Sequence, residues 1–364
     1  MSTPAIQKPF DPNAAASPDA GIFGLACPRD DAKLLLLPVP FDATTSYGGG
    51  ASAGPEAILE ASLQVDLLDH HFGLIYEHGI HMPAPPAWIR ESSEHARALA
   101  APIIARGGTD YSPADLAAIA DINAAGDRIN AHTYNQTAAA LAAGQIPGLV
   151  GGDHSTPYGA IRACADHLAT LAKLGDAHAR QGLGILHIDA HFDLRKAFEG
   201  FKWSHASIMR NVLDHTPPAL VSRLVSVGIR DYCPEERDYA KDARARVATH
   251  FDADIAAALD EGKHFSDICA KVLAELPPCI YVSFDIDGLD PALCPGTGTP
   301  VPGGLSFNRA AALLSAARNA GKRVVGFDLV EVCPAPSPAD APSQWDANVG
   351  SRILYKLCGL AANA

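Results

Sequence analysis

The stretch that decides the fold spans residues 184–195 and reads Gly-Ile-Leu-His-Ile-Asp-Ala-His-Phe-Asp-Leu-Arg. Its apolar beginning is typical of a buried strand in a parallel sheet, so the residues after it should lie at the carboxyl end of that strand. Side chains two apart on an extended segment share a face, and we therefore expect Asp189, His191 and Asp193 to point the same way. Carboxylates held close together raise each other's pKa and lose hydration. A divalent cation between them would remove this conflict; the alternative is that the three residues cap the strand in solvent.

Two other apolar runs end in the same kinds of side chain. Residues 279–284 read Cys-Ile-Tyr-Val-Ser-Phe and lead into Asp285 and Asp287, and residues 148–152 open into a glycine turn before His154. In an open α/β sheet, ligands bind outside the carboxyl ends of the strands. Three strand ends should therefore meet in one crevice. Together they offer two imidazoles and four carboxylates, which suit two divalent ions that share bridging carboxylates better than one ion.

The rest of the chain alternates between predicted strands and helices. This alternation predicts a three-layer α/β/α fold with a central, mostly parallel sheet. We expect residues 1–30 to form an N-terminal extension and residues 31–364 to form a single catalytic domain, with a proline- and alanine-rich connection over residues 82–113. The further predicted strands cover residues 33–40, 224–229 and 323–327, and the predicted helices cover residues 55–65, 114–143, 158–179, 267–276 and 350–360.

Composition narrows the class of protein. The chain has 364 residues, of which 48% are hydrophobic, and a net charge of −13 at pH 7. A strongly acidic protein is a poor partner for nucleic acid or for an anionic membrane. The eight cysteines show no paired spacing and are typical of reduced thiols, and no stretch of about eighteen apolar residues or secretory signal is apparent. We therefore expect a cytoplasmic protein that binds neither nucleic acid nor membrane.

Three motifs resemble the signatures of the ureohydrolase superfamily, which contains arginase, agmatinase, guanidinobutyrase and formimidoylglutamase. They are Gly-Gly-Asp-His-Ser at 151–155, Asp-Ala-His-Phe-Asp at 189–193 and Ser-Phe-Asp-Ile-Asp-Gly-Leu-Asp-Pro at 283–291. The resemblance implies two divalent metal ions, Mn²⁺ or Ni²⁺, that activate a water for attack on a guanidinium carbon. It also implies a homo-oligomer, a trimer or hexamer. One metal would be held by His154, Asp189, Asp193 and Asp285, and the other by His191, Asp189, Asp285 and Asp287.

The same resemblance assigns roles to residues outside the metal motifs. It places Glu331 as the carboxylate that pairs bidentately with the substrate guanidinium. His205 would shuttle protons to the leaving group, and its charged form should be favoured among so many carboxylates. Thr297 would shape the wall of the pocket. Together with the bridging Asp189, His205 and Glu331 are the predicted catalytic residues.

The loop at 194–204, Leu-Arg-Lys-Ala-Phe-Glu-Gly-Phe-Lys-Trp-Ser, should contact the substrate tail, which is the part beyond the guanidinium. The aromatic residues Phe198, Phe201 and Trp203 would line the pocket and reduce its size, which disfavours arginine. Arg195 and Lys196 would oppose a second positive charge, as in agmatine. The loop resembles the guanidine hydrolase branch, which uses nickel, and so favours free guanidine as the substrate. Agmatine, 4-guanidinobutyrate and formimidoylglutamate remain alternatives, as does a catalytically silent subunit of an oligomer.

Overall fold

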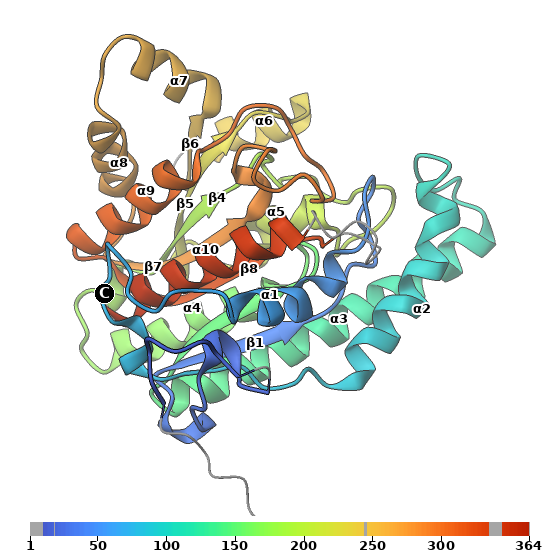
Figure 1. Ribbon diagram of the computed structural model, residues 1–364. Helices are drawn as coiled ribbons and strands as arrows, with labels where there is room; N and C mark the ends of the chain where they lie inside the picture. Colours follow the sequence, from blue (N-terminus) through green and yellow to red (C-terminus); the bar gives the residue numbers. More distant parts are fainter. Residues whose placement is uncertain (1–9, 18, 244–245, 335–343, 364) are drawn as a thin grey trace, which may run out of the picture.

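The structure, a computed structural model, describes residues 10–17, 19–243, 246–334 and 344–363. Within these ranges the centre is an eight-stranded sheet in the order β2-β1-β3-β8-β7-β4-β5-β6, and each neighbouring pair of strands is parallel (Figure 1). The expected α/β fold with a parallel sheet is therefore confirmed. The strands are β1 Leu34–Val39, β2 Ile80–His81, β3 Ile146–Gly151, β4 Leu183–Ile188, β5 Val221–Ile229, β6 Val247–Phe251, β7 Cys279–Asp285 and β8 Arg323–Val330.

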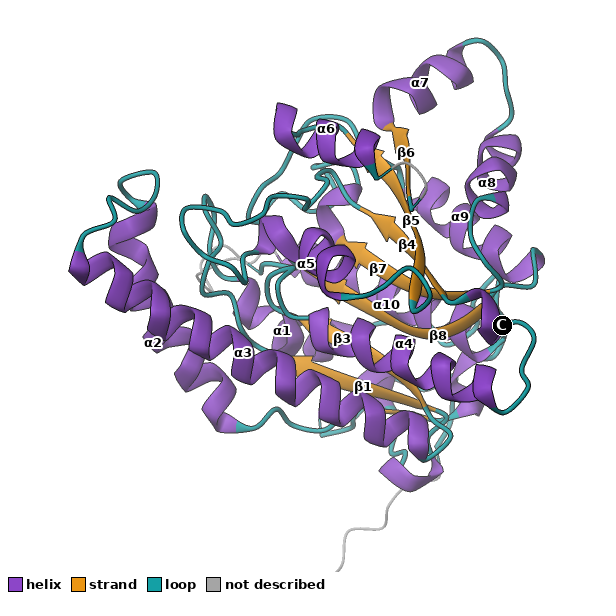
Figure 2. Ribbon diagram, turned by 180° about the vertical axis from the view of Figure 1, so that it is seen from behind, coloured by secondary structure: helices purple, strands orange, loops and turns teal. Residues whose placement is uncertain are grey.

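Helices cover both faces of the sheet, and each face has its own apolar core. One core packs beneath α1 (Gly54–Ser62), α8 (Phe265–Ala274), α9 (Phe307–Asn319) and α10 (Trp345–Ala362). The other packs beneath α2 (Ala87–Ile104), α3 (Pro113–Ala142), α4 (Tyr158–Lys173) and α5 (Ile208–His215), and Figure 2 shows α3 and α4 crossing that face. The shorter helices α6 (Pro234–Asp242) and α7 (Asp252–Asp260) flank the edge strand β6. No helix in the described ranges is both long and apolar enough to span a membrane.

Three strands of the sheet are buried along their whole length. Every residue of β1, β4 and β7 is buried, as expected for parallel strands with helices on both faces. Continuous apolar runs of this kind are the pattern from which buried strands can be predicted in a sequence.

One stretch predicted as a connection is a helix. Residues 87–104 form α2, which packs against α3 and buries Ile89, Ala96 and Ile103, so the expectation of a connection over 82–113 is wrong. Four of the five prolines in residues 82–113 lie outside α2; Pro86 immediately precedes its first turn, and only Pro102 lies within the helix, in the last turn. Alanine, which fills much of the segment between them, is the strongest helix former.

The strand order positions the predicted site. β3, β8, β7 and β4 are consecutive in the sheet and end at Gly151, Val330, Asp285 and Ile188. Parallel strands place their carboxyl ends at one edge of the sheet, so the loops after these four strands are neighbours. Segments up to about 180 residues apart in sequence therefore meet at one edge of the sheet, as in the contact of His154 with Glu331, 177 residues away.

Candidate metal centre and active site

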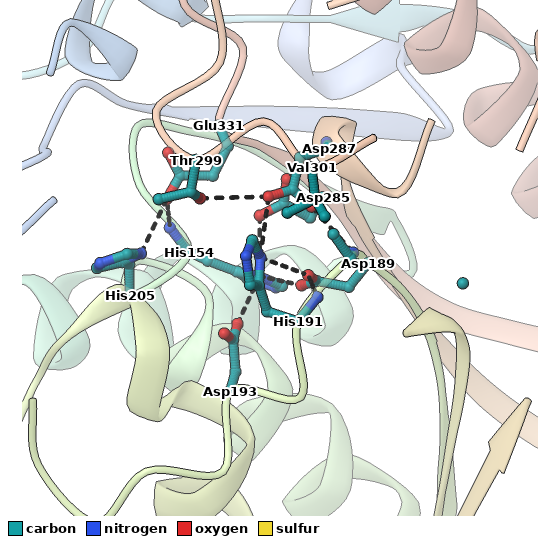
Figure 3. A network of polar contacts seen from close by, with 12 residues as sticks. His154, Asp189, His191, Asp193, His205, Asp285, Asp287, Thr299, Val301 and Glu331 are labelled. Atoms are coloured by element: carbon teal, nitrogen blue, oxygen red, sulfur yellow. Dashed lines mark hydrogen bonds and ion pairs between the residues drawn. The ribbon is translucent and has the colours of Figure 1, made fainter. Parts of the chain in front are cut away.

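His154 lies at the centre of a group of three carboxylates. Its Nδ1 atom is 3.0 Å from Asp189 Oδ2, 2.9 Å from Asp193 Oδ2 and 3.2 Å from Asp285 Oδ2 (Figure 3). A glycine turn places the imidazole there: a Cβ atom on Gly152 would lie 2.0 Å from the backbone oxygen of Phe41. Only glycine allows so close an approach between the turn and the end of β1.

The hydrogen bonds on the far side of the ring decide which nitrogen of His154 can bind a metal. Nε2 is 2.9 Å from Ser283 Oγ, and that hydroxyl donates to Asp328 Oδ1 at 3.1 Å. Because the hydroxyl donates its proton to Asp328, it accepts from His154, which assigns the ring proton to Nε2. Nδ1 then directs a lone pair at three carboxylates, and it is buried without a hydrogen-bond partner in the described part of the chain. This arrangement is suited to a cation.

His191 forms the second group. Its Nδ1 atom is 3.1 Å from Asp287 Oδ2 and 3.5 Å from Asp189 Oδ1. Asp189 thus presents one oxygen to His154 and the other to His191, as a bridging ligand would. The His191 side chain is 24% exposed, whereas the His154 side chain is 1% exposed, so the second group lies on the solvent side.

The pKa values show that the clustered carboxylates repel one another. Burial raises the pKa of Asp193 to about 6, and the charge of Asp189 adds to the rise. Burial together with Asp287 and Asp189 raises the pKa of Asp285 well above its ordinary value. Burial lowers the pKa of His154, but its contacts with Asp189, Asp193 and Asp285 outweigh that effect and raise it. Positive charge is therefore favoured between these residues, and a pair of divalent cations fits the site.

The route by which the ligands converge differs from the expected one. β4 ends at Ile188, so Asp189, His191 and Asp193 lie in the loop after the strand and do not alternate along it. Asp193 has a positive φ of 55°, which turns its side chain back toward His154. Asp285 is the last residue of β7, and its Oδ1 atom accepts from the backbone N–H of Asp287 at 2.8 Å. The predicted convergence is present, but turns produce it.

Glu331 follows β8 and faces the cluster. Its Oε1 atom accepts from the backbone N–H of His154 at 2.9 Å, while Oε2 is buried and has no hydrogen-bond partner among the described residues. The backbone is held at a φ of 61°, and its carbonyl oxygen accepts from Thr297 Oγ1 at 2.9 Å. Burial raises the pKa of Glu331 well above its usual value, and the charge of Asp285 adds to the rise. The side chain is therefore oriented and has one oxygen free for a cationic group.

His205 lies beside Glu331 in a different protonation state from the expected one. Its Nδ1 atom is 3.9 Å from Glu331 Oε1, and Nε2 is buried without a hydrogen-bond partner in the described chain. The pKa of His205 is lowered to about 3, and burial is the largest cause. The charges of His191 and His154 also lower this pKa, and together they outweigh the opposite effect of Asp189. The expectation that its charged form is favoured is therefore wrong, because burial outweighs the carboxylates. A neutral imidazole can accept a proton.

Two of the three aromatic residues predicted to line the pocket, Phe201 and Trp203, pack against other parts of the protein. Trp203 Nε1 donates to Asp127 of α3 at 2.7 Å, and a Cβ atom on Gly126 would lie 2.8 Å from Trp203. Phe201 is fully buried in the core beneath α2 to α5. These are packing contacts, and they give no support to the prediction that either ring touches the substrate. The third aromatic residue, Phe198, has its ring 6.2 Å from that of His205.

The sequence model of the Arginase family matches residues 32–359. The chain belongs to the arginase family. It is 32% identical over 308 residues to an N(1)-aminopropylagmatine ureohydrolase of Thermus thermophilus, covering 84% of this chain and 85% of the relative. It is 28% identical over 328 residues to an agmatinase of Proteus mirabilis, covering 89% of this chain and 87% of the relative. The fold is similar to that of the proclavaminate amidino hydrolase from Streptomyces clavuligerus, with a TM-score of 0.68, 24% identity and full coverage of both chains.

Membership of the arginase family gives the class of reaction and of metal centre. This chain is a ureohydrolase that acts on C–N bonds of guanidino groups. The family uses a binuclear divalent metal centre, typically Mn²⁺, and the His and Asp cluster of this chain has the ligands for one. The guanidine hydrolase branch and nickel, both expected from the loop at 194–204, are not confirmed.

Proposed function

We propose that this arginase-family enzyme hydrolyses an agmatine-type substrate, in which a guanidinium is carried on a chain that ends in an amine, to urea and the free amine. The observation that carries the reaction type is the free Oε2 atom of Glu331, which is buried beside two imidazoles and four carboxylates. The relatives named aminopropylagmatine ureohydrolase and agmatinase favour this substrate over free guanidine.

The arguments for free guanidine lose force in the structure. Phe201 and Trp203 pack into the core and against α3, so they do not show that the pocket is small. Arg195 is compensated: its Nε atom is 3.7 Å from Glu236 Oε2, and its guanidinium lies over the ring of Phe198 at 4.5 Å. A paired and stacked arginine opposes a cationic tail much less than a free one would.

Glu199 offers a partner for the amine of the tail. It follows Phe198 in the loop, has a positive φ of 55°, and has a buried Oε2 atom without a hydrogen-bond partner among the described residues. The positive φ belongs to the tight turn that joins Phe198 to Phe201, whose backbones exchange two hydrogen bonds, and it fixes the shape of the loop at Glu199. Burial raises the pKa of Glu199, and the charge of Arg97 opposes the rise. An ammonium group near the carboxylate would act in the same direction as Arg97 and would balance the negative charge.

The side chains then have distinct tasks. Glu331 binds the guanidinium through forked hydrogen bonds and orients its planar carbon. His205, which is neutral, accepts a proton at an imidazole nitrogen and returns it to the amine as the C–N bond breaks. A pair of divalent cations held by His154, His191 and the four aspartates would supply a water of lowered pKa as the nucleophile.

A substrate panel tests the proposal. Urea release is measured with agmatine, N(1)-aminopropylagmatine, 4-guanidinobutyrate, arginine and guanidine, and formamide release is measured with formimidoylglutamate, with the enzyme loaded with Mn²⁺ and separately with Ni²⁺. We expect the highest kcat/KM with one of the two amine-tailed substrates. A higher kcat/KM with guanidine would restore the interpretation based on the loop sequence. Absence of urea or formamide from every substrate, in protein that holds no metal, would indicate a silent subunit.

A variant of Glu199 tests the tail contact. Glu199→Gln should raise KM for agmatine and leave the kinetics with guanidine unchanged, because guanidine has no tail. Glu235→Gln is the matched control, since Glu235 is an exposed glutamate on α6. Equal effects on both substrates would contradict the assignment. The homo-oligomer implied by family resemblance stays a prediction that light scattering can test.

A further inference from the structure

A line of buried polar side chains crosses four neighbouring strands just before the metal ligands. Ser226 on β5 pairs in register with His187 on β4, which pairs with Ser283 on β7, which pairs with Asp328 on β8. Residues in register on parallel strands face the same side of the sheet, so these four side chains form one polar row. All four are 0% exposed. Burying polar groups in the centre of a sheet costs desolvation free energy, which other interactions of these groups must offset.

His187, within this polar row, is close enough to the cluster to be mistaken for a metal ligand. One of its nitrogens lies within 4.8 Å of ligand atoms of His154, Asp189 and Asp193, and its ring centre is 5.4 Å from that of His154. Both of its nitrogens, however, are already used. Nε2 is 2.8 Å from Asp189 Oδ2, and Nδ1 is 3.1 Å from Ser226 Oγ.

The first of these hydrogen bonds decides the role of the ring. An ionised carboxylate only accepts, so the proton between His187 and Asp189 belongs to Nε2. A protonated nitrogen has no lone pair for a metal, and Nδ1 points toward β5. His154 differs, because its Nδ1 atom is buried without a hydrogen-bond partner in the described chain.

The hydrogen bond from His187 helps to orient the carboxylate of Asp189. Its Oδ2 atom accepts from His187 and lies 3.0 Å from His154 Nδ1, while its Oδ1 atom accepts from the backbone N–H of His191 at 2.6 Å. One donor on each oxygen fixes the plane of the carboxylate. That plane directs one oxygen to each half of the cluster, as a bridging ligand requires.

We propose that His187, held by Ser226, is a positioning residue that orients Asp189 as the bridge between the two metal sites and does not itself bind metal. The inference rests on the metal centre of the proposed function. Partners behind a metal ligand typically change metal affinity about 10- to 100-fold when they are removed. The side chain of His187 should therefore control how tightly the metals bind, not how many bind.

Metal binding measured without substrate tests the proposal. Equilibrium dialysis against Mn²⁺ alone gives the number of sites and their affinity for the wild-type protein and each variant. His187→Leu removes the donor and keeps much of the volume, and we expect it to weaken Mn²⁺ binding about 10- to 100-fold with two ions still bound at saturation. His187→Gln, whose amide N–H reaches about as far as Nε2, should recover most of the affinity.

Controls separate positioning from general damage. Ile185→Val removes one methyl group from the same strand and the same face, two residues earlier, and should leave Mn²⁺ affinity unchanged. Ser226→Ala frees the ring at Nδ1 and should cause a smaller loss than His187→Leu. Circular dichroism of the metal-free proteins confirms that each variant folds.

Two results would overturn the proposal. Wild-type affinity in His187→Leu would show that the contact does not position Asp189; should that variant not fold, wild-type affinity in Ser226→Ala would show the same. Loss of one Mn²⁺ per chain at saturation would show that His187 is a ligand. Failure of the wild-type protein to bind Mn²⁺ would instead refute the metal centre, which keeps the two tests distinct.

Discussion

Replacing Glu331 with glutamine tests how the enzyme holds its substrate. The amide of glutamine keeps an oxygen that can accept from the N–H of His154, now 2.9 Å from Oε1, and it keeps the side-chain volume. It replaces the free Oε2 atom with an NH₂ group, which donates and so opposes the N–H groups of a guanidinium. The substitution therefore removes the substrate contact and leaves the rest of the site in place.

The burial of Glu331 sets the size of the effect. The residue is 2% exposed, so solvent does not screen its pairing with the substrate as it does for a surface ion pair, which contributes about 0–1 kcal/mol. Removing one partner of a buried pair costs about 3–5 kcal/mol. That cost corresponds to a loss of roughly 200- to 5,000-fold in kcat/KM. Glutamine is a better test than alanine, because alanine would also leave a cavity beside His205.

The assay measures urea release from agmatine at several substrate concentrations, with metal content determined on the same samples. We expect Glu331→Gln to retain the wild-type metal content, since Glu331 is not among the predicted ligands. A kcat/KM within tenfold of the wild-type value would refute the role of Glu331 in binding guanidinium. Loss of metal from the variant would show that the residue belongs to the metal centre.

Four further predictions concern the metal site, its pH dependence and the glycine turn. Asp189→Asn removes a bridging charge and should abolish turnover and lower metal content; normal metal and rate would contradict the bridge. Dialysis against EDTA should remove activity, and Mn²⁺ or Ni²⁺ should restore it, whereas activity in protein shown to be metal-free would refute metal dependence. The pKa of His205 is lowered to about 3, so below pH 6.5 the unfolded chain binds a proton at this residue that the folded chain does not, and the contribution of His205 to stability should fall by about 2 kcal/mol between pH 7.5 and 5.0. The raised pKa values of Asp193, Asp285 and Glu331 act in the opposite direction, so the test compares urea unfolding of the metal-free wild type with that of His205→Gln: the wild type should lose about 2 kcal/mol relative to the variant, and an equal change in both would contradict the prediction. Gly152→Ala places a Cβ atom against Phe41 and should lower the free energy of unfolding by about 1–3 kcal/mol; unchanged urea unfolding would contradict the close approach.

The metal ligands could be predicted because their signal is local. Each lies within a few residues of a buried apolar run, and parallel strands bring such positions to one edge of the sheet. Their mechanism of convergence could not be predicted, because it depends on turns such as the positive φ of Asp193. Alternation along a strand gave the right grouping of Asp189 and His191 although the strand had already ended at Ile188.

Other features depend on burial that sequence does not display. Phe201 and Trp203 follow the metal motif closely, but only the packing of α3 shows that they point into the protein. The neutral state of His205 has the same origin, since burial outweighs the visible carboxylates. The role of His187 could not be predicted, because the sequence places it inside a strand and does not show that Asp189 and Ser226 lie at its two nitrogens. Its position two residues before Asp189 was the available signal.

The central claim is that two cations bind between His154 and His191 with Asp189 shared. Anomalous diffraction from crystals soaked in Mn²⁺ tests it most directly. We predict two anomalous peaks per chain, about 3.5–4 Å apart, one beside each of these histidines. A single peak, or peaks remote from both histidines, would contradict the account.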